Sequence, residues 1–340
     1  MKRPTMSDIA RAAGVSKGAV SYALNGRPGV SEPTRARVLR IAKELGWVPN
    51  SAARALSAAK AGAIGLVLAR PARILGLEPF FMQLISGSEA VLAERSLALV
   101  LQVVPDVVAE CEVYRRWWAA HRVDGVIMVD QRVSDPRLDV LTELGLPAVV
   151  VGGHTGHPGL GSVGADDSGA MRSLVGYLAA LGHRRIARVA GQGELRHIAA
   201  RTAVFEQVTV ELKVEASMLH GDFTGEEGAR LARQLLSRTD RPTAILFDND
   251  VMAVAGLAVA QEMGLAVPAE LSIVSWDDSP LCRLVHPPLT ALARDIPALG
   301  ATAARTLAEI LDGGAPAAIK AAPLTLTVRG STGRCAKIAK

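Results

Sequence analysis

The sequence predicts two structural classes in one chain: an all-α domain of three helices near the N-terminus, then an α/β core of two doubly wound parallel sheets. Helix caps follow one another closely before residue 47, and short apolar runs alternate with helical stretches after residue 62. A chain of 340 residues is longer than one hydrophobic core usually serves, and 49% hydrophobic residues can fill more than one. We therefore expect a small domain over 1–46, a linker over 47–60 and a core over 61–340.

Three short helices are expected in the first domain, each with a Thr or Ser cap at its start and a glycine at its end. Their limits are Thr5 to Gly14, Ser16 to Gly26 and Ser31 to Gly46. The apolar positions expected to face a shared core are Ile9, Ala10, Ala13, Val20, Ala23, Leu24, Val38, Ile41, Ala42 and Leu45. Gly14 supplies the positive φ that a tight turn between two steeply crossing helices requires. This is the minimum of a helix-turn-helix domain.

The second of these helices has the side chains that a DNA groove would require. Gly18 removes bulk where a helix meets base edges, Lys17 can donate to guanine O6 and N7, and Tyr22 can reach a base or a phosphate. The other candidate DNA contacts in this domain are short polar side chains suited to phosphates: Thr5, Ser16, Ser21, Asn25 and Ser31. The same residue types also serve as helix caps and turn residues, and that alternative stays open here.

Positive charge is concentrated at the N-terminal end of the chain. Residues 1–60 hold eleven Lys or Arg and three acidic residues, a net charge of +8. The whole chain carries +5, so residues 61–340 carry −3. A basic head on a slightly acidic body is typical of a nucleic-acid-binding module joined to a second function.

The linker contains a short alanine-rich helix signal. Asn50 can cap one to two turns whose large side chains are Arg54 and Leu56, and so short a helix is marginal in water unless a partner holds it. An apolar wedge beside basic residues suits insertion into a DNA minor groove. A plain linker is the alternative.

These residues carry a resemblance to a known family. The stretch "TMSDIARAAGVSKGAVSYALNGRPGVSEPTRARVLRIAKELGWVPNSAARALS", residues 5–57, resembles the head of the lactose-repressor (LacI/GalR) family of bacterial transcription regulators. The resemblance implies base-reading positions at Lys17, Gly18 and Tyr22, a hinge helix near 50–57, and Leu56 as the side chain that kinks the operator. The family usually has Thr where this chain has Ala19, and its base-reading positions vary, so the operator sequence does not follow.

The core is expected to contain two parallel sheets covered by helices on both faces, because its apolar runs are continuous rather than alternating. The runs are "AIGLVLA", "LALVLQVV", "VDGVIMVD", "PAVVVGG", "RRIARVAG", "TAILFDND" and "LSIVSWDD". Helices are expected near 80–95, 168–181 and 250–263. Polar groups follow two runs, "DND" at 248–250 and "WDDS" at 276–279, where ligands bind in such folds.

The core resembles the periplasmic-binding-protein-like (type I) effector core of the same family. That resemblance implies a first subdomain of about 61–161 plus 293–322 and a second of about 162–292 plus 323–340. It also implies six effector contacts: Phe80, Phe81, Arg201, Phe223, Asn249 and Asp277. Their chemistry fits a polyol, because carboxylate and amide groups bridge hydroxyls and an aromatic face covers the apolar side of a sugar ring.

Several other kinds of site are disfavoured by the sequence. Gly159, Gly161 and Gly164 match G-x-G-x-x-G by letter, but the strand-to-helix turn of a dinucleotide site is not expected there. His154 and His157 lack a third metal ligand nearby, and three widely spaced cysteines predict neither a disulfide framework nor a zinc site. Neither a catalytic motif of the common hydrolase or nucleotide-binding types nor a cofactor motif occurs, so we expect no enzyme and no cofactor.

We therefore expect a transcription regulator, most simply a repressor released from its operator by a sugar inducer. Because one helix-turn-helix reads a half-site, a homodimer on a near-palindromic double-stranded DNA is expected. The end of the sequence lacks leucine heptads, so a tetramer is not expected. Neither an apolar span nor a signal peptide is apparent, which predicts a cytoplasmic protein. A corepressor, a phosphoprotein partner or, far less favoured, a sugar-binding protein without a DNA role are the alternatives.

Overall fold

The computed structural model describes residues 4–47, 60–70, 78–153 and 156–335. The chain separates into two compact units, Met1–Ala61 and Gly62–Lys340. We call the first the head and the second the core, and describe each by itself.

The head contains three helices at the predicted places: α1 (Met6–Ala13), α2 (Lys17–Leu24) and α3 (Glu32–Glu44). The predicted cap Thr5 forms a capping box with Asp8, and Gly14 ends α1 with a φ of +65°. The Ser16 hydroxyl accepts a hydrogen bond from the Ala19 N–H at 3.1 Å and so caps α2. The helix-turn-helix arrangement is confirmed.

Small side chains allow the three head helices to pack closely. The buried core consists of Ile9, Ala10, Ala13, Val20, Ala23, Val38 and Ala42. Leu24 and Ile41 pack against this core while partly buried. The prediction that Leu45 faces inward was wrong, because Leu45 is 42% exposed. It is the C-cap at the end of α3 and is not part of the buried core of the head.

The first subdomain of the core is built on a six-stranded parallel sheet in the order β11-β5-β4-β3-β1-β2. Its strands are β1 (Ala63–Ala69), β2 (Ala98–Val104), β3 (Gly125–Met128), β4 (Ala148–Val151), β5 (Gly161–Gly164) and β11 (Ala318–Lys320). Its helices are α6 (Pro79–Glu94), α7 (Val107–Ala119), α8 (Pro136–Leu144) and α14 (Ile296–Leu311).

The second subdomain contains a six-stranded sheet in the order β12-β10-β9-β8-β6-β7, in which β12 alone is antiparallel to its neighbour. Its strands are β6 (Arg185–Ala190), β7 (Glu215–His220), β8 (Ala244–Phe247), β9 (Ser272–Ser275), β10 (Thr290–Ala293) and β12 (Thr325–Thr327). Its helices are α9 (Asp167–Ala180), α10 (Arg196–Glu211), α11 (Gly225–Leu236), α12 (Asp250–Glu262) and α13 (Pro280–Leu284).

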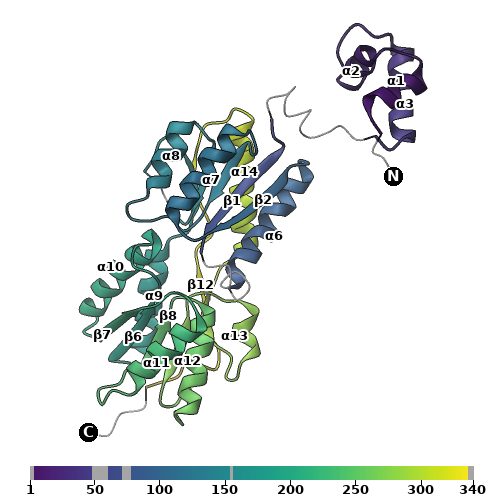
Figure 1. Ribbon diagram of the computed structural model, residues 1–340. Coiled ribbons are helices and arrows are strands. Elements are labelled where there is room, and N and C mark those ends of the chain that lie inside the picture. The colour runs from purple at the N-terminus through teal and green to yellow at the C-terminus, as the bar shows by residue number, and fades with distance from the viewer. Residues whose placement is uncertain (1–3, 48–59, 71–77, 154–155, 336–340) are drawn as a thin grey trace. The chain divides into compact units, whose positions relative to one another are not determined.

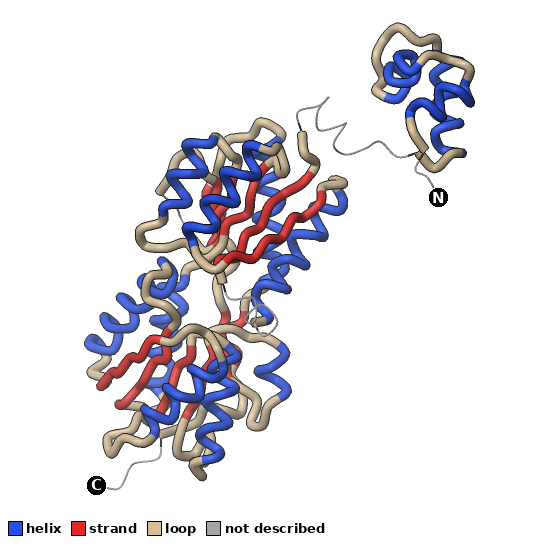
Figure 2. Tube along the Cα trace, viewed as in Figure 1, coloured by secondary structure: helices blue, strands red, loops and turns tan. Residues whose placement is uncertain are grey.

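Helices cover both faces of each sheet, as the continuous apolar runs predicted (Figures 1 and 2). In the first subdomain α6 and α14 pack together on one face and α7 and α8 on the other. Separate apolar clusters form on the two faces of each sheet, four in all for the core. The central strands β1, β3, β4, β8 and β9 are therefore buried on both sides, whereas β2, β7, β11 and β12 are partly exposed.

The chain passes three times between the two subdomains, after β5, after β10 and after β11. The first passage comes slightly later than the expected boundary near 161, because residues 161–164 form β5 of the first sheet. Within the described part of the chain, no helix is long and apolar enough to span a membrane.

Candidate functional site

The exposed surface of α2 carries the three residues expected at the base-reading positions. Lys17 and Gly18 are exposed and lie in the first turn of α2. Tyr22 is 44% exposed, and one edge of its ring lies close to Gly29, so the ring is held while its rim stays accessible. Together they form one accessible face at the start of a helix, the geometry with which such helices enter a major groove.

The short polar residues of the head also make hydrogen bonds within the domain. Thr5 and Ser16 cap α1 and α2. The Asn25 amide donates to the Ser21 carbonyl at 2.9 Å, and the Ser31 and Thr34 hydroxyls lie 2.9 Å apart. These contacts are the capping and turn role that the sequence left open as an alternative to phosphate contact. Arg54, Leu56 and the expected hinge helix lie outside the described residues.

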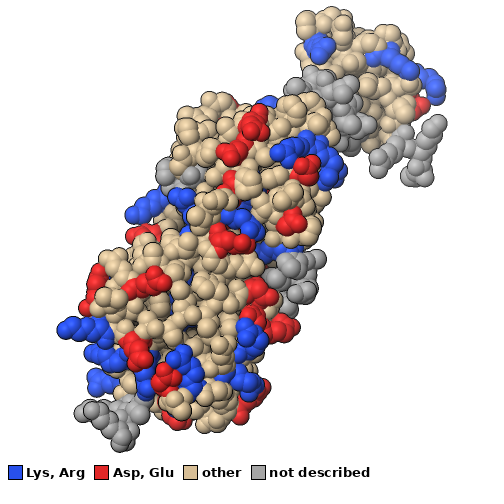
Figure 3. Space-filling model, turned by 60° about the vertical axis from the view of Figure 1, so that its left-hand side comes forward, with Lys and Arg blue, Asp and Glu red and all other residues tan. Residues whose placement is uncertain are grey.

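Charge is distributed differently over the two units. On the face seen in Figure 3, the exposed charges of the head are mainly Lys and Arg, whereas both signs are interspersed over the core. This agrees with the +8 carried by residues 1–60. A basic head is the electrostatic requirement for binding a phosphate backbone.

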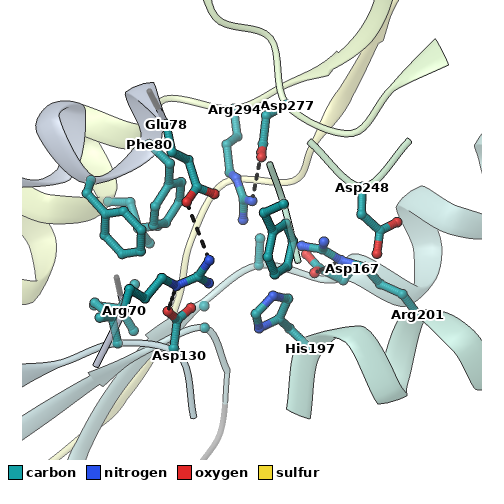
Figure 4. Close-up of a pocket in the computed structure, with 18 residues that line it drawn as sticks. Arg70, Glu78, Phe80, Asp130, Asp167, His197, Arg201, Asp248, Asp277 and Arg294 are labelled. Atoms are coloured by element: carbon teal, nitrogen blue, oxygen red, sulfur yellow. Dashed lines mark hydrogen bonds and ion pairs between the residues drawn. The ribbon is translucent and has the colours of Figure 1, made fainter. Parts of the chain in front are cut away.

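The core contains a pocket between its two subdomains (Figure 4). Its volume is about 60 Å³, several times the roughly 10–15 Å³ that holds one water molecule. Charged and aromatic side chains make up most of its lining: Arg70, Glu78, Phe80, Phe81, Asp130, Asp167, His197, Arg201, Phe223, Asp248, Asp277 and Arg294. The pocket can therefore offer both hydrogen-bonding groups and ring faces to a small molecule.

Five of the six expected effector contacts line this pocket: Phe80, Phe81, Arg201, Phe223 and Asp277. The sixth, Asn249, lies behind the lining and is 1% exposed. Its amide donates to the Phe223 carbonyl at 3.0 Å, and its side-chain oxygen accepts from the Met252 N–H at 2.8 Å as the N-cap of α12. Asn249 thus contacts the backbone of a lining residue rather than the pocket.

Guanidinium–carboxylate pairs set the electrostatics of the lining. Arg201 contacts Asp167 at 2.7 Å, and Arg294 contacts Asp277 at 3.1 Å. Burial alone would raise the pKa of Asp167, but Arg201 and then Arg294 lower it below its ordinary value. These oxygens and N–H groups are fixed in the pocket and retain hydrogen-bonding capacity for a ligand.

Two further titratable groups in the pocket are shifted mainly by burial. The pKa of Glu78 is raised to about 8, because burial outweighs the attraction of Arg70. The pKa of His197 is lowered to about 4, by burial and by the neighbouring Arg201. His197 is therefore neutral near pH 7.

Six titratable residues of the lining were not expected from the sequence: Arg70, Glu78, Asp130, Asp167, His197 and Arg294. Three of them, Arg70, Asp130 and Arg294, lie one or two residues beyond strands β1, β3 and β10. The rule that ligands bind at the carboxyl ends of parallel strands pointed to Asp248 after β8, and the same rule applied to every strand would have found these three as well.

Comparison with known proteins agrees with both parts of the structure. Residues 5–50 match the family described as bacterial regulatory proteins, lacI family, and residues 175–332 match a periplasmic binding protein-like domain. The transcriptional regulator CelR of Thermobifida fusca is 32% identical over 317 residues, which cover 92% of this chain and 93% of that protein.

Two solved structures give the same result. A CelR–cellobiose complex is 31% identical with a TM-score of 0.73, covering 97% of this chain and 100% of that one. A lac repressor dimer bound to operator and an anti-inducer is 26% identical with a TM-score of 0.84, covering 98% and 100%. A helix-turn-helix head joined to a periplasmic-binding-protein-like core defines a class of ligand-responsive DNA-binding regulators. The chain belongs to the LacI family of transcription regulators.

Proposed function

We propose that this regulator is a cytoplasmic repressor which binds a near-palindromic operator as a homodimer and is released by a sugar bound between the two core subdomains. The carrying observation is the pocket, in which Phe rings lie beside fixed carboxylate and guanidinium groups. Sugars use both features, since their hydroxyls need hydrogen-bond partners and their C–H faces pack on aromatic rings. The cellobiose complex of a similar regulator supports the same ligand class.

The DNA contacts proposed for the head are those of the accessible face of α2, with Lys17, Gly18 and Tyr22 over the bases. Thr5, Ser16, Ser21, Asn25 and Ser31 are proposed to contact phosphates from cap and turn positions. Arg54 and Leu56 are proposed to act in the minor groove from the linker over 47–60. These assignments rest on the exposure of α2 and on the basic charge of the head.

A thermal-shift screen of the full chain against uncharged mono- and disaccharides, cellobiose included, tests the ligand class. A sugar at a hundredfold its dissociation constant adds about 2.7 kcal/mol, which raises the melting temperature by roughly 4 °C. An operator selected from random DNA then allows fluorescence anisotropy with and without that sugar. We expect the sugar to lower the affinity of the protein for the operator.

Asp277→Asn is the matched variant for this experiment, because it keeps the shape of a lining side chain while removing its charge. It should weaken sugar binding about 10- to 100-fold and leave operator affinity without sugar unchanged. Asp240→Asn, at an exposed ion pair with Arg238, is the control. A sugar that tightens operator binding would make the protein a corepressor-type switch. A screen without any sugar hit would redirect the search to other small molecules or a protein partner.

A further inference from the structure

Arg70 reaches across the pocket from one subdomain to the other. It follows β1 of the first subdomain, where its Nε–H donates to an Asp130 carboxylate oxygen at 2.7 Å and its Nη1 lies 3.5 Å from Glu78. Figure 4 marks both contacts. The guanidinium carbon lies 4.7 Å from the ring centroid of Phe223, which belongs to the second subdomain. The side chain is thus anchored by charge on its own side and stacked on an aromatic ring on the other.

The Phe223 ring has little surface left for another molecule. Phe223 is 4% exposed. The tip of its ring packs on Gly191, where an added Cβ would come within 2.0 Å of the Phe223 Cζ. Because Arg70 covers the ring from the pocket side, a sugar cannot stack on it while the guanidinium stays in place.

Two of the residues that Arg70 contacts, Asp130 and Phe223, are held in unusual backbone conformations. Asp130 has a φ of +53° and Phe223 a φ of +71°, a conformation that residues other than glycine adopt only when their surroundings impose it. Arg137 donates to the Asp130 carbonyl at 2.8 Å, and Asn249 donates to the Phe223 carbonyl at 3.0 Å. Each subdomain therefore presents its half of the Arg70 contact with a buried polar side chain as support.

We propose that Arg70 occupies the effector's stacking position on Phe223 and thereby determines which ligands bind. An effector must bring an apolar face that replaces the guanidinium on the ring, while Arg70 keeps its contact with Asp130. This inference rests on the proposed function of the pocket as the effector site. It assigns Asn249 and Arg137 as positioning residues for the two sides of the contact.

Arg70→Lys separates the stacking from the charge. A lysine keeps a cation near Asp130, so this buried carboxylate is not left without a positive charge nearby, but it lacks the planar guanidinium that stacks on a ring. Exchanging a guanidinium–ring contact for an open ring face should tighten sugar binding by roughly 2- to 30-fold. Arg241→Lys, at a surface ion pair with Glu270, is the matched control and should bind as the wild type does.

The first measurement is calorimetric titration of cellobiose, and of each uncharged sugar in the screening panel, into the full-length wild type and both variants. Tighter sugar binding by Arg70→Lys, but not by Arg241→Lys, supports the proposal. Equal or weaker binding by Arg70→Lys overturns it, whatever the sugar does to operator affinity. Operator release by the wild type tests the proposed function separately. If no sugar binds to either the wild type or Arg70→Lys, the proposed sugar site and the proposed role of Arg70 both fail, since the uncovered Phe223 ring of the variant should bind a sugar.

A second measurement needs no ligand. The midpoint of urea unfolding is compared for the wild type, Arg70→Lys, Phe223→Leu and the double variant. If the guanidinium lies on the ring in solution, Arg70→Lys should lower the midpoint in the wild type and by half as much or less in the Phe223→Leu background. Additive decreases would show that the two side chains do not interact, which would overturn the proposal.

Discussion

His197 lines the pocket as a neutral side chain, because burial and Arg201 lower its pKa to about 4. In the unfolded chain the pKa of a histidine is near 6.5, so between about pH 6.5 and 4 the unfolded state binds more protons than the folded state. The free energy of unfolding should therefore decrease as the pH is lowered from 6.5 to 4, by up to about 3 kcal/mol from His197 alone.

Urea unfolding of the wild type and His197→Asn at pH 7 and pH 4.5 checks this expectation. The variant should lose less stability on acidification than the wild type, and His121→Asn at an exposed surface position serves as the control. Equal losses in the wild type and His197→Asn would show that this histidine does not remain neutral in the folded protein.

Individual site residues were predictable where a motif or a family position marked them. Phe80, Phe81, Arg201, Phe223 and Asp277 all lie in the pocket lining. Asn249 has the same residue chemistry but lies behind the lining, because it caps α12 at the point where the chain leaves β8. The direction in which a side chain points at the end of a strand depends on the local backbone conformation, and the residue type alone does not specify that conformation.

At the scale of single elements, glycines set how closely α6 and α14 approach. A Cβ added at Gly87 would lie 1.9 Å from the Pro297 carbonyl oxygen, and one at Gly300 would lie 2.1 Å from the Leu84 carbonyl oxygen. The Ser88 hydroxyl donates across the same contact to the Gly300 carbonyl at 3.1 Å. This helix pair covers one face of the first sheet, so its spacing matters to the whole subdomain.

Gly87→Ala should therefore lower the free energy of unfolding of the core by roughly 1–3 kcal/mol or more, because backbone rather than a flexible side chain blocks the new methyl group. Gly176→Ala in α9 is the control, since no atom lies within 4 Å of its added Cβ. In a helix interior this control change should be neutral or stabilising by up to about 1 kcal/mol. Comparable destabilisation by both variants would show that the α6–α14 contact is looser than described.

The accessible face of α2 should determine DNA sequence specificity, whereas the residues that cap α2 should contribute to the stability of the head. Lys17→Ala should weaken discrimination between operator and altered sequences by about 1–3 kcal/mol and leave the melting temperature of the protein unchanged. Lys43→Ala, in the last turn of α3, is the charge-matched control. Fluorescence anisotropy measures the affinity of each variant for operator and for scrambled DNA. An unchanged ratio of the two affinities in Lys17→Ala would remove Lys17 from the base-reading set.

The three head helices and seven of the strands followed directly from the sequence, because caps, glycine turns and continuous apolar runs are local signals. The seven apolar runs all contain strands. Five strands were not foreseen, β5, β7, β10, β11 and β12, since none of them is a continuous run of large apolar residues and their pairing is imposed by the sheets they join. Leu45 shows the same limit at a helix end.

At the scale of the whole molecule, the proposed function needs two copies of the chain on one operator. If α2 reads a half-site, as proposed, a near-palindrome needs a second copy related by a two-fold axis. Light scattering of the free protein at micromolar concentration should give about twice the 35.6 kDa mass of the chain. A mass near four chains would contradict the proposed dimer.

The central claim is that the pocket and the DNA-binding head are coupled in free energy. If a sugar weakens operator binding, linkage requires the operator to weaken sugar binding by the same factor, commonly about 5- to 150-fold. The most direct measurement is titration of the identified sugar into free full-length protein and into the protein saturated with its selected operator. We predict a dissociation constant higher on the operator by the factor measured in anisotropy. The same dissociation constant in both states would contradict the account.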